Sequence, residues 1–337
     1  MKARSRTAAG TLALLAAAAA ALLYAWYGVD RRGEEEGKRK EAEEKVLAFD
    51  TGQVKALRIE AGGAVTSLTR AGAGGAGWRI EGLGEAADGG AVEGLLSRLA
   101  GLRRKAEVAA RPDAAALASS GLAPPRGRIE LDLEDGRRLA VSLGEPSGFD
   151  GSLPVRAGEG PVLLVDAGAE WALLRKTDDL RDRALLRFEP GKVQRVRLLA
   201  GGRVAWEAAR RPGVEGEAAG WDLTAPRAAP ADAGRVESTL RAASALRALR
   251  FADGAGRARE AGLEPPARTL VLLGEGGSEL GRVELGKEAN DSRFARSSAG
   301  PRILEVDRGA AAAVAPSVEE LVERPKPPPA GPKAEGQ

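Results

Sequence analysis

The chain has 337 residues, with 51 lysine and arginine residues against 48 aspartate and glutamate residues, so its formal net charge is only +3. It contains no cysteine and no histidine, which excludes disulfides, thiolate or imidazole metal ligands, cysteine nucleophiles and histidine general bases. At about 150 residues per domain, this length predicts two domains.

The N-terminal region carries a candidate membrane span. Residues 8–29 form an uncharged run of 22 residues, preceded by basic residues and closed by aromatic side chains at 24–27. At a rise of about 1.5 Å per residue, this run is long enough to cross the roughly 30 Å hydrocarbon core of a bilayer. We expect an uncleaved anchor with residues 1–7 as a cytoplasmic tail. A cleaved signal peptide is the alternative, but the run is long for one and shows no clear small-residue cleavage site.

The segments that flank the body are polar. Residues 30–45 are almost all charged and place Glu34, Glu35 and Glu36 four positions before basic residues, which favours a solvated helical stalk over a charged partner site. Residues 325–337 are rich in proline and are expected to be disordered.

The body contains an internal sequence repeat, with one unit at 46–184 and the second at 185–324. VLAFDTGQVKALRI at 46–59 aligns with LLRFEPGKVQRVRL at 185–198 without gaps. A Gly-Trp pair and a Gly-Leu-x-Pro-Pro segment then recur in the same order, with the offset held between 139 and 144. Compositional bias does not place phenylalanine, tryptophan and a proline pair in one order twice, so we interpret the body as a tandem duplication.

The periodicity within each unit predicts an α+β fold with a mostly antiparallel sheet and one main helix. In the first unit we expect strands at 54–59, 65–68 and 78–80, a helix at 91–104 with Asp88 as its N-cap, a hairpin of 129–133 and 139–143 around Asp135-Gly136, a last strand at 161–165 and a short helix. The second unit repeats this order, with Asp232 as the equivalent N-cap and a hairpin turn at Gly276-Gly277.

The Asp-Leu-Arg-Asp-Arg run that opens 179–188, the Gly-Trp strand and the Pro-Ala-Asp at 230–232 resemble the domain-of-unknown-function 4340 family. The resemblance spans most of 46–324. It implies a bacterial inner-membrane protein with its body on the periplasmic side, linked with auxiliary components of gliding-type ABC transporters. The family has no established catalytic residues, so the resemblance assigns none here.

Two short motifs are candidate binding sites. Gly72, Gly74 and Gly77 satisfy a G-x-G-x-x-G pattern, but a strand follows where a dinucleotide site needs a helix, so we expect a hairpin loop. Asn290-Asp291 alone is too sparse for a calcium loop. We therefore predict no cofactor and no metal, and the interspersed charges predict no nucleic-acid partner.

The sequence between the units holds Asp179, Arg181, Asp182 and Arg183. We interpret this cluster as an ion-paired junction that fixes the angle between the units, with a partner-docking site as the alternative.

Taken together, these patterns predict a non-enzymatic, single-span envelope protein that serves as an interaction or scaffold module beside an ABC-type transport or motility complex. Two alternatives stay open. One is a module that binds a glycan or small ligand in a cleft between the units. The other is a hydrolase that works with paired carboxylates, which need no histidine.

Overall fold

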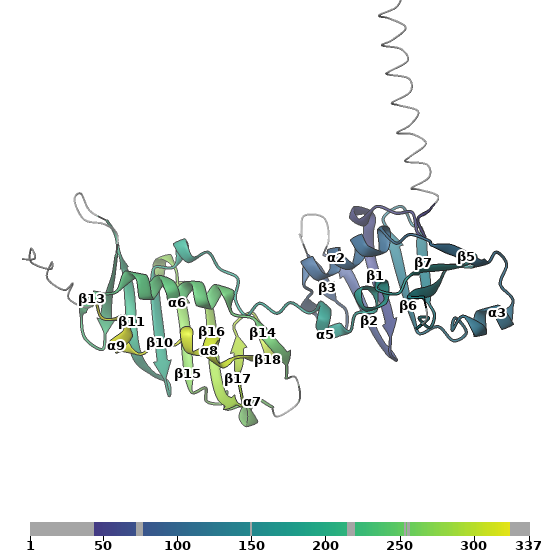
Figure 1. The fold of residues 1–337 in the computed structure, drawn as a ribbon. Coiled ribbons are helices and arrows are strands. Elements are labelled where there is room, and N and C mark those ends of the chain that lie inside the picture. The colour runs from purple at the N-terminus through teal and green to yellow at the C-terminus, as the bar shows by residue number, and fades with distance from the viewer. Residues whose placement is uncertain are drawn as a thin grey trace, which may run out of the picture. The chain divides into compact units, whose positions relative to one another are not determined.

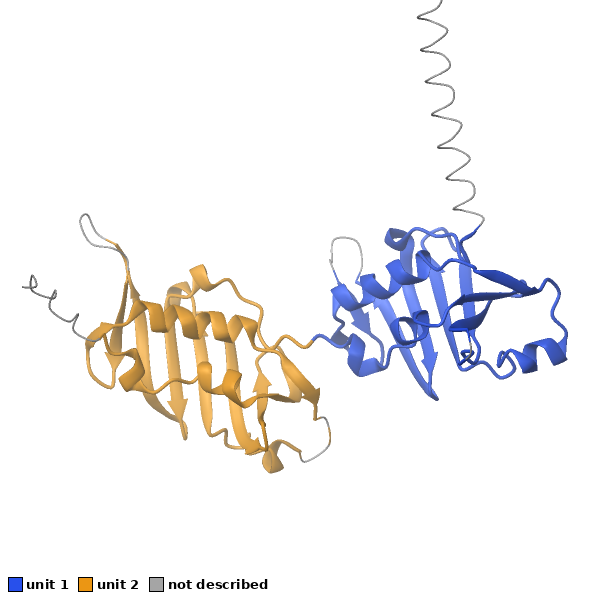
Figure 2. Ribbon diagram, in the orientation of Figure 1, with its two compact units in different colours: residues 1–182 blue, residues 183–337 orange. Residues whose placement is uncertain are grey.

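The computed structural model describes residues 44–71, 77–148, 150–213, 220–252, 254 and 257–323. The predicted N-terminal tail, the predicted anchor, all but the last two residues of the predicted stalk, Gly72 and Gly74, and the proline-rich tail lie outside these residues. The chain divides into two compact units between Asp182 and Arg183 (Figure 2). Among the described residues, no helix has the length and apolar character needed to cross a membrane.

Unit 1 is built on a nine-stranded sheet, counted over its described residues, with the order β4-β3-β2-β1-β6-β7-β8-β9-β5 (Figure 1). Every pair of neighbouring strands is antiparallel. The strands are β1 (Val54–Ala61), β2 (Ala64–Arg70), β3 (Trp78–Ile80), β4 (Glu85–Ala86), β5 (Ala106–Ala109), β6 (Gly127–Leu133), β7 (Arg138–Leu143), β8 (Ser152–Ala157) and β9 (Val162–Asp166).

Unit 2 repeats this topology, with nine described strands in the order β13-β12-β11-β10-β15-β16-β17-β18-β14. The strands are β10 (Arg195–Ala200), β11 (Arg203–Arg211), β12 (Gly220–Ala225), β13 (Ala229–Ala231), β14 (Ala248–Phe251), β15 (Arg268–Leu273), β16 (Glu279–Ala289), β17 (Ser292–Ser297) and β18 (Gly300–Asp307). The order matches that of unit 1 strand for strand, and the registers agree as well. Ile59 faces Ile129 in unit 1, and Leu198 faces Leu270 in unit 2. The predicted α+β class with antiparallel sheets is therefore confirmed.

One face of each sheet is covered by the main helix, which crosses the strands in Figure 1. In unit 1 this is α2 (Gly89–Ala100), which buries Val92, Leu95, Leu96 and Leu99. The Asp88 side chain accepts a hydrogen bond from the Ala91 N–H at 3.0 Å, as its predicted N-cap role requires. In unit 2, α6 (Ala233–Ala245) is capped in the same way by Asp232.

The helix predicted at 91–104 is wrong at its C-terminal end. It stops at Ala100, and the Gly101 N–H bonds back to the Ser97 carbonyl at 3.0 Å. Leu102 is buried beyond the helix, and the chain then turns into β5. A buried leucine at helical spacing made the pattern look longer than the helix is, because tertiary packing can bury an apolar side chain without extending the helix.

Short helices complete the covered face of each unit. Unit 1 has α4 (Ala169–Leu173) and α5 (Thr177–Leu180), and unit 2 has α8 (Arg308–Ala313) and α9 (Val318–Leu321). The final helix returns to the edge strand in both units. The Asp88 N–H bonds to the Leu180 carbonyl, and the Asp232 N–H bonds to the Leu321 carbonyl, each at 2.8 Å. Each unit thus closes its own core.

The opposite face is only partly covered. In unit 2, α7 (Arg257–Glu260) and the segment after it pack Ala261 and Leu263 against Ile303 of β18. In unit 1, α3 (Ala114–Ser119) and the segment after it reach Gly144, the residue after β7. The middle strands of both sheets keep this second face exposed.

The hairpin turns follow local sequence. Gly136, at a φ of +86°, turns β6 into β7, as the Asp-Gly signal predicts. Asn290, at a φ of +54°, turns β16 into β17, so the Asn-Asp pair is used for a hairpin. The sequence patterns missed β4, β5 and β8 of unit 1 and their counterparts β13, β14 and β17 of unit 2. Strand β8 contains Pro154, which weakens a strand signal.

Candidate functional site

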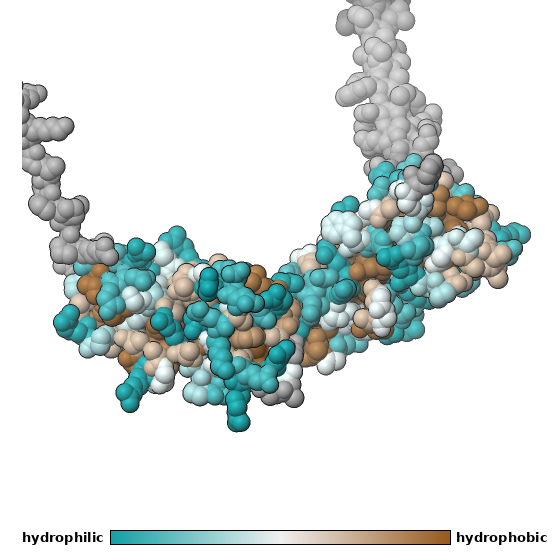
Figure 3. Space-filling model, turned by 60° about the horizontal axis from the view of Figure 1, so that its bottom comes forward, coloured by the Kyte–Doolittle hydropathy of each residue, from teal (hydrophilic) through white to brown (hydrophobic). Residues whose placement is uncertain are grey.

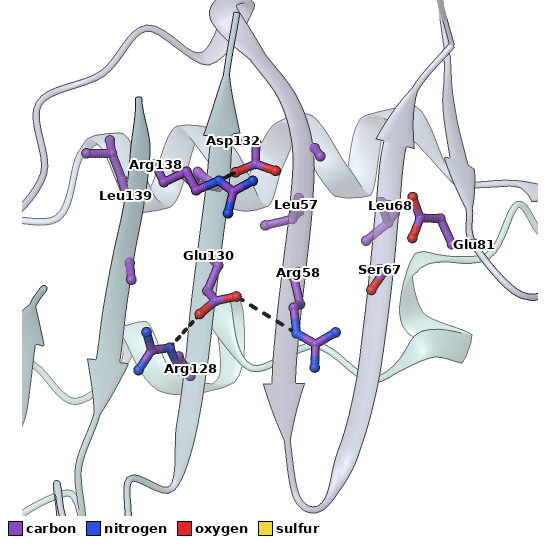
Figure 4. Close-up of a pocket in the computed structure, with 13 residues that line it drawn as sticks. Leu57, Arg58, Ser67, Leu68, Glu81, Arg128, Glu130, Asp132, Arg138 and Leu139 are labelled. Carbon is purple, nitrogen blue, oxygen red and sulfur yellow. Dashed lines mark hydrogen bonds and ion pairs between the residues drawn. The ribbon is translucent and has the colours of Figure 1, made fainter. Parts of the chain in front are cut away.

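The surface that the fold leaves available is the uncovered face of each sheet, here called the open face. In unit 1 it displays Arg58 of β1, Arg128, Glu130 and Asp132 of β6, and Arg138 of β7 (Figure 4). Strand alternation explains this placement, because Ile129, Leu131 and Leu133 of β6 point to the core and the residues between them point away.

Ion pairs link the open-face side chains of unit 1 across and along the strands. The Arg138 Nε atom lies 3.1 Å from an Asp132 oxygen on the facing strand. Glu130 accepts from Arg128 at 2.8 Å and lies 3.9 Å from Arg58. These side chains line a hollow of about 460 Å³ that spans β1, β2, β6 and β7.

These ion pairs contribute little to the stability of the unit. Arg138 is 86% exposed and its partner Asp132 is 37% exposed. Exposed pairs of this kind are worth about 0–1 kcal/mol each, because water screens the charges and holding long side chains in place costs entropy. The open face is therefore a patterned charged surface, free to change without loss of the fold.

The open face of unit 2 carries different side chains on the same framework. Glu207 pairs with Arg197 at 2.5 Å, and Glu284 pairs with Arg296 at 2.7 Å. Between these pairs, the central strand β15 presents Val271 where unit 1 has Glu130 and Leu273 where it has Asp132. The charge rows of unit 1 are thus replaced by two ion-paired flanks around an aliphatic strip.

On the covered face, by contrast, the two units keep one polar network. In unit 1 the Trp78 indole N–H donates to Glu93 at 3.0 Å, and Arg70 donates to the same carboxylate oxygen at 3.0 Å. In unit 2, Trp221 and Arg210 donate to one oxygen of Glu237 at 3.0 and 3.1 Å. The arginine in each unit also donates to a backbone carbonyl: Arg70 to that of Val54, which begins β1, and Arg210 to that of Val193, two residues before β10.

Most of the surface shown in Figure 3 is hydrophilic, with hydrophobic residues scattered over it.

The family of the chain follows from a match to a family model. Residues 78–218 and 221–325 match the model described as domain of unknown function (DUF4340). The chain belongs to the DUF4340 family. No curated protein and no solved structure matches it.

The DUF4340 match begins at Trp78 in one stretch and at Trp221 in the other, the two indole donors of the repeated network. It also includes the run at 179–188 that carries the sequence resemblance. The resemblance to this family is therefore confirmed.

The predicted junction residues are divided between the two units of this DUF4340 chain. Arg181 is 4% exposed and donates to both oxygens of Glu85, each at 3.0 Å, within unit 1. Asp179 accepts from the Lys176 N–H at 3.1 Å and so closes the first turn of α5. No local sequence pattern pointed to Glu85, which lies 96 residues from Arg181 along the chain.

Asp182 and Arg183 complete that cluster on either side of the division. Asp182 is buried, and its N–H donates to the Ala86 carbonyl in unit 1. Arg183 belongs to unit 2, where its guanidinium donates to the Ala248 and Leu249 carbonyls. Each of these four residues therefore makes hydrogen bonds within its own unit. Their role in fixing the angle between the units, or in docking a partner, stays a prediction.

Among the described residues, four carboxyl groups of the DUF4340 body have displaced pKa values, and all four are lowered. The Arg137 N–H lowers the pKa of Asp135, the Ser152 hydroxyl that of Asp150, Lys105 that of Asp166, and Arg250 that of Glu305. These groups stay ionised at neutral pH, which is the opposite of what a general acid requires. Among the described residues, no cluster of three acidic side chains is arranged to hold a metal ion.

Proposed function

We propose that this protein is a single-span, membrane-anchored scaffold whose extracytoplasmic body docks subunits of an ABC-type transport or motility complex through its open sheet faces. The anchor is residues 8–29, with the body on the periplasmic side of the bacterial inner membrane. The uncharged run at 8–29, the membership of the DUF4340 family and the geometry of the open faces support this proposal.

The observation that carries the proposal is the divergence of the open faces over a repeated framework. The covered faces keep the Trp78 and Trp221 networks, because both units need the same packing of helix on sheet. At equivalent open-face positions, Glu130 is replaced by Val271. Two faces that differ in charge and hydropathy suit two different protein surfaces, since complementary charge and apolar contact decide which partner fits.

The shape of the open face also favours a protein partner over a small molecule. Small-molecule sites are concave and mostly apolar, with a few convergent polar groups. The hollow in unit 1 instead lies on a sheet face lined by arginine and carboxylate side chains. Arginine is enriched where proteins meet, because its guanidinium forms paired hydrogen bonds with carboxylates.

Site-specific crosslinking from native membranes tests this proposal. The chain has no cysteine, so one introduced cysteine carries a photo-crosslinker without background. Ala140→Cys places it in the open-face hollow, and Gly94→Cys places it on the exposed side of α2 as the control. We expect transporter subunits to crosslink at position 140 and not at 94. Absence of any transport or motility subunit at 140, from membranes that contain the full-length protein, would contradict the proposal.

A further inference from the structure

A second surface of unit 1 is basic and carries an exposed tryptophan. Arg98 at the end of α2, the Arg103-Arg104-Lys105 segment that follows, and Trp171 of α4 line a hollow of about 470 Å³. We call these five residues the basic edge. They lie apart from the residues that line the open-face hollow, since the two hollows share none of their lining residues.

Trp171 is the most exposed large hydrophobic side chain among the described residues. It is 65% exposed, while Trp78, Trp206 and Trp221 are all buried in the cores. The Arg175 guanidinium lies 5.4 Å from the centre of its ring. A tryptophan that is exposed beside cations is suited to a membrane surface, because its ring partitions to the level of the lipid headgroups.

The charges of the basic edge are only partly neutralised. Lys105 pairs with Asp166 at 3.0 Å, Arg103 with Glu44 at 3.5 Å, and Arg104 with Glu107 at 3.9 Å. Arg98 and Arg175 have no acidic partner among the described residues. Among the described residues, the four cations of the basic edge and the neighbouring Arg175 therefore face three carboxylates, which leaves a positive surface.

The duplication provides an internal comparison, because the fold does not require this surface. The equivalents of Arg98, Arg104, Lys105 and Trp171 in unit 2 are Ala242, Ala248, Leu249 and Ala312, by the same alignment of helices and strands. Only Arg103 keeps its charge, as Arg247. The basic edge thus belongs to unit 1 alone, the unit that follows the predicted anchor.

The basic edge also lies where the chain enters unit 1. The Arg104 N–H donates to the Glu44 carbonyl at 2.8 Å, so Glu44 sits directly beside it. Between the end of the anchor run at Val29 and Glu44 there are 14 residues, 30–43. At no more than about 3.6 Å per residue, this segment keeps the basic edge within about 50 Å of the membrane surface.

We propose that the basic edge of unit 1 binds the headgroups of anionic phospholipids in the membrane that holds the anchor. Arg98, Lys105 and their neighbours would neutralise lipid phosphates while Trp171 inserts at headgroup depth, which holds unit 1 against the bilayer. The inference rests on the proposed anchor and adds a second membrane contact to it.

The test uses the full chain in lipid nanodiscs, with a nitroxide on Ser97→Cys beside the basic edge and headgroup-chelated nickel as the relaxing probe. We expect several-fold stronger relaxation in discs that contain phosphatidylglycerol than in discs of phosphatidylcholine alone. Combined Arg98→Gln, Lys105→Gln and Trp171→Ala substitutions should abolish that difference. A label on Ala245→Cys, at the equivalent end of α6, should show no dependence on lipid charge.

Equal relaxation of the Ser97 label in both kinds of disc would overturn the inference, as would a lipid dependence that survives the triple substitution. Unit 2 carries alanine at two of the three equivalent positions, so the variant is expected to fold, and its denaturation midpoint checks this. Alkaline carbonate extraction separates the two proposals. A chain released from membranes contradicts the anchor, whereas a retained chain without lipid dependence contradicts only the lipid-binding surface.

Discussion

The indole N–H of Trp78 donates a hydrogen bond to the Glu93 carboxylate at 3.0 Å, which ties strand β3 to the main helix α2. Arg70 joins the same oxygen and lies 4.9 Å from the centre of the indole ring. Because Trp221 and Glu237 repeat this contact at 3.0 Å in unit 2, it is part of how either sheet holds its helix.

Replacement of Glu93 tests that role. Glu93→Ala leaves the Trp78 N–H and one Arg70 N–H without their acceptor, so we expect a loss of about 1–3 kcal/mol in the free energy of unfolding. Urea unfolding of the full chain, followed by circular dichroism, measures it. Glu134→Ala, in the exposed β6–β7 turn, is the matched control and should change stability by less than about 0.5 kcal/mol. Equal effects from the two variants would refute a structural role for Glu93.

Arg181 is expected to be far more sensitive than exposed ion-pair partners. Its side chain is 4% exposed, and Arg181→Gln would remove the bidentate partner of Glu85. We expect a destabilisation of about 2–3 kcal/mol. Lys192→Gln breaks a pair whose members are 68% and 71% exposed and should cost less than about 1 kcal/mol. If Arg181→Gln unfolds at the same urea concentration as wild type, the buried pair is not stabilising.

Gly144 and Gly286 allow a close approach of two backbone segments. A Cβ at Gly144 would overlap the Ser120 carbonyl oxygen, and a Cβ at Gly286 would overlap that of Ala261. Gly144→Ala should therefore cost about 1–3 kcal/mol, since the strand or the segment must move. Gly94→Ala, in open space on α2, should instead stabilise by about 0.5–1 kcal/mol. Thermal unfolding of both variants would show opposite shifts, and shifts of the same sign would contradict this packing.

Glu305 predicts a dependence of stability on pH. The hydrogen bond from Arg250 holds the pKa of Glu305 below its ordinary value of 4.5. The unfolded chain protonates near 4.5 while the folded chain stays ionised, so this stabilisation is present above that pH and is lost as the pH falls through the folded pKa. Arg250→Gln should lower the urea midpoint at pH 7, with the deficit shrinking below pH 4.5.

The control for that series is Arg98→Gln, because Arg98 has no acidic partner among the described residues. Its urea midpoint should run parallel to that of the wild type across the same pH range. A deficit of Arg250→Gln that stays constant from pH 7 to below 4.5 would show that Glu305 does not titrate with a lowered pKa.

Charge reversal on the open face should separate binding from stability. Combined Arg58→Glu and Arg138→Glu substitutions replace exposed ion pairs with exposed like-charge neighbours, each worth no more than about 1 kcal/mol, so we expect only a modest loss of stability. The same variant should lose the crosslinks that Ala140→Cys forms with transporter subunits, because the charge pattern is inverted. Lys192→Glu, on unit 2, should keep them. Retained crosslinks in the double variant would contradict docking through this face.

Local sequence patterns were sufficient to predict the framework of the protein. Local spacing was enough for the duplication, the Asp88 cap and the Asp135-Gly136 turn, because caps, hairpin turns and periodicity act over a few residues. The ordered tryptophan and proline motifs also identified the family. Where the pattern was local but ambiguous, as at Leu102, the helix was predicted too long.

The tertiary structure alone decided which side chains meet. Arg181 was singled out at the junction between the units, yet its partner is Glu85, brought to it by an edge strand 96 residues earlier in the chain. Trp171 was an unmatched tryptophan in the sequence and became a surface feature only when α4 placed it beside Arg98 and Lys105. Strand pairing and helix packing join residues that are distant in the sequence, so local patterns carry no record of these contacts.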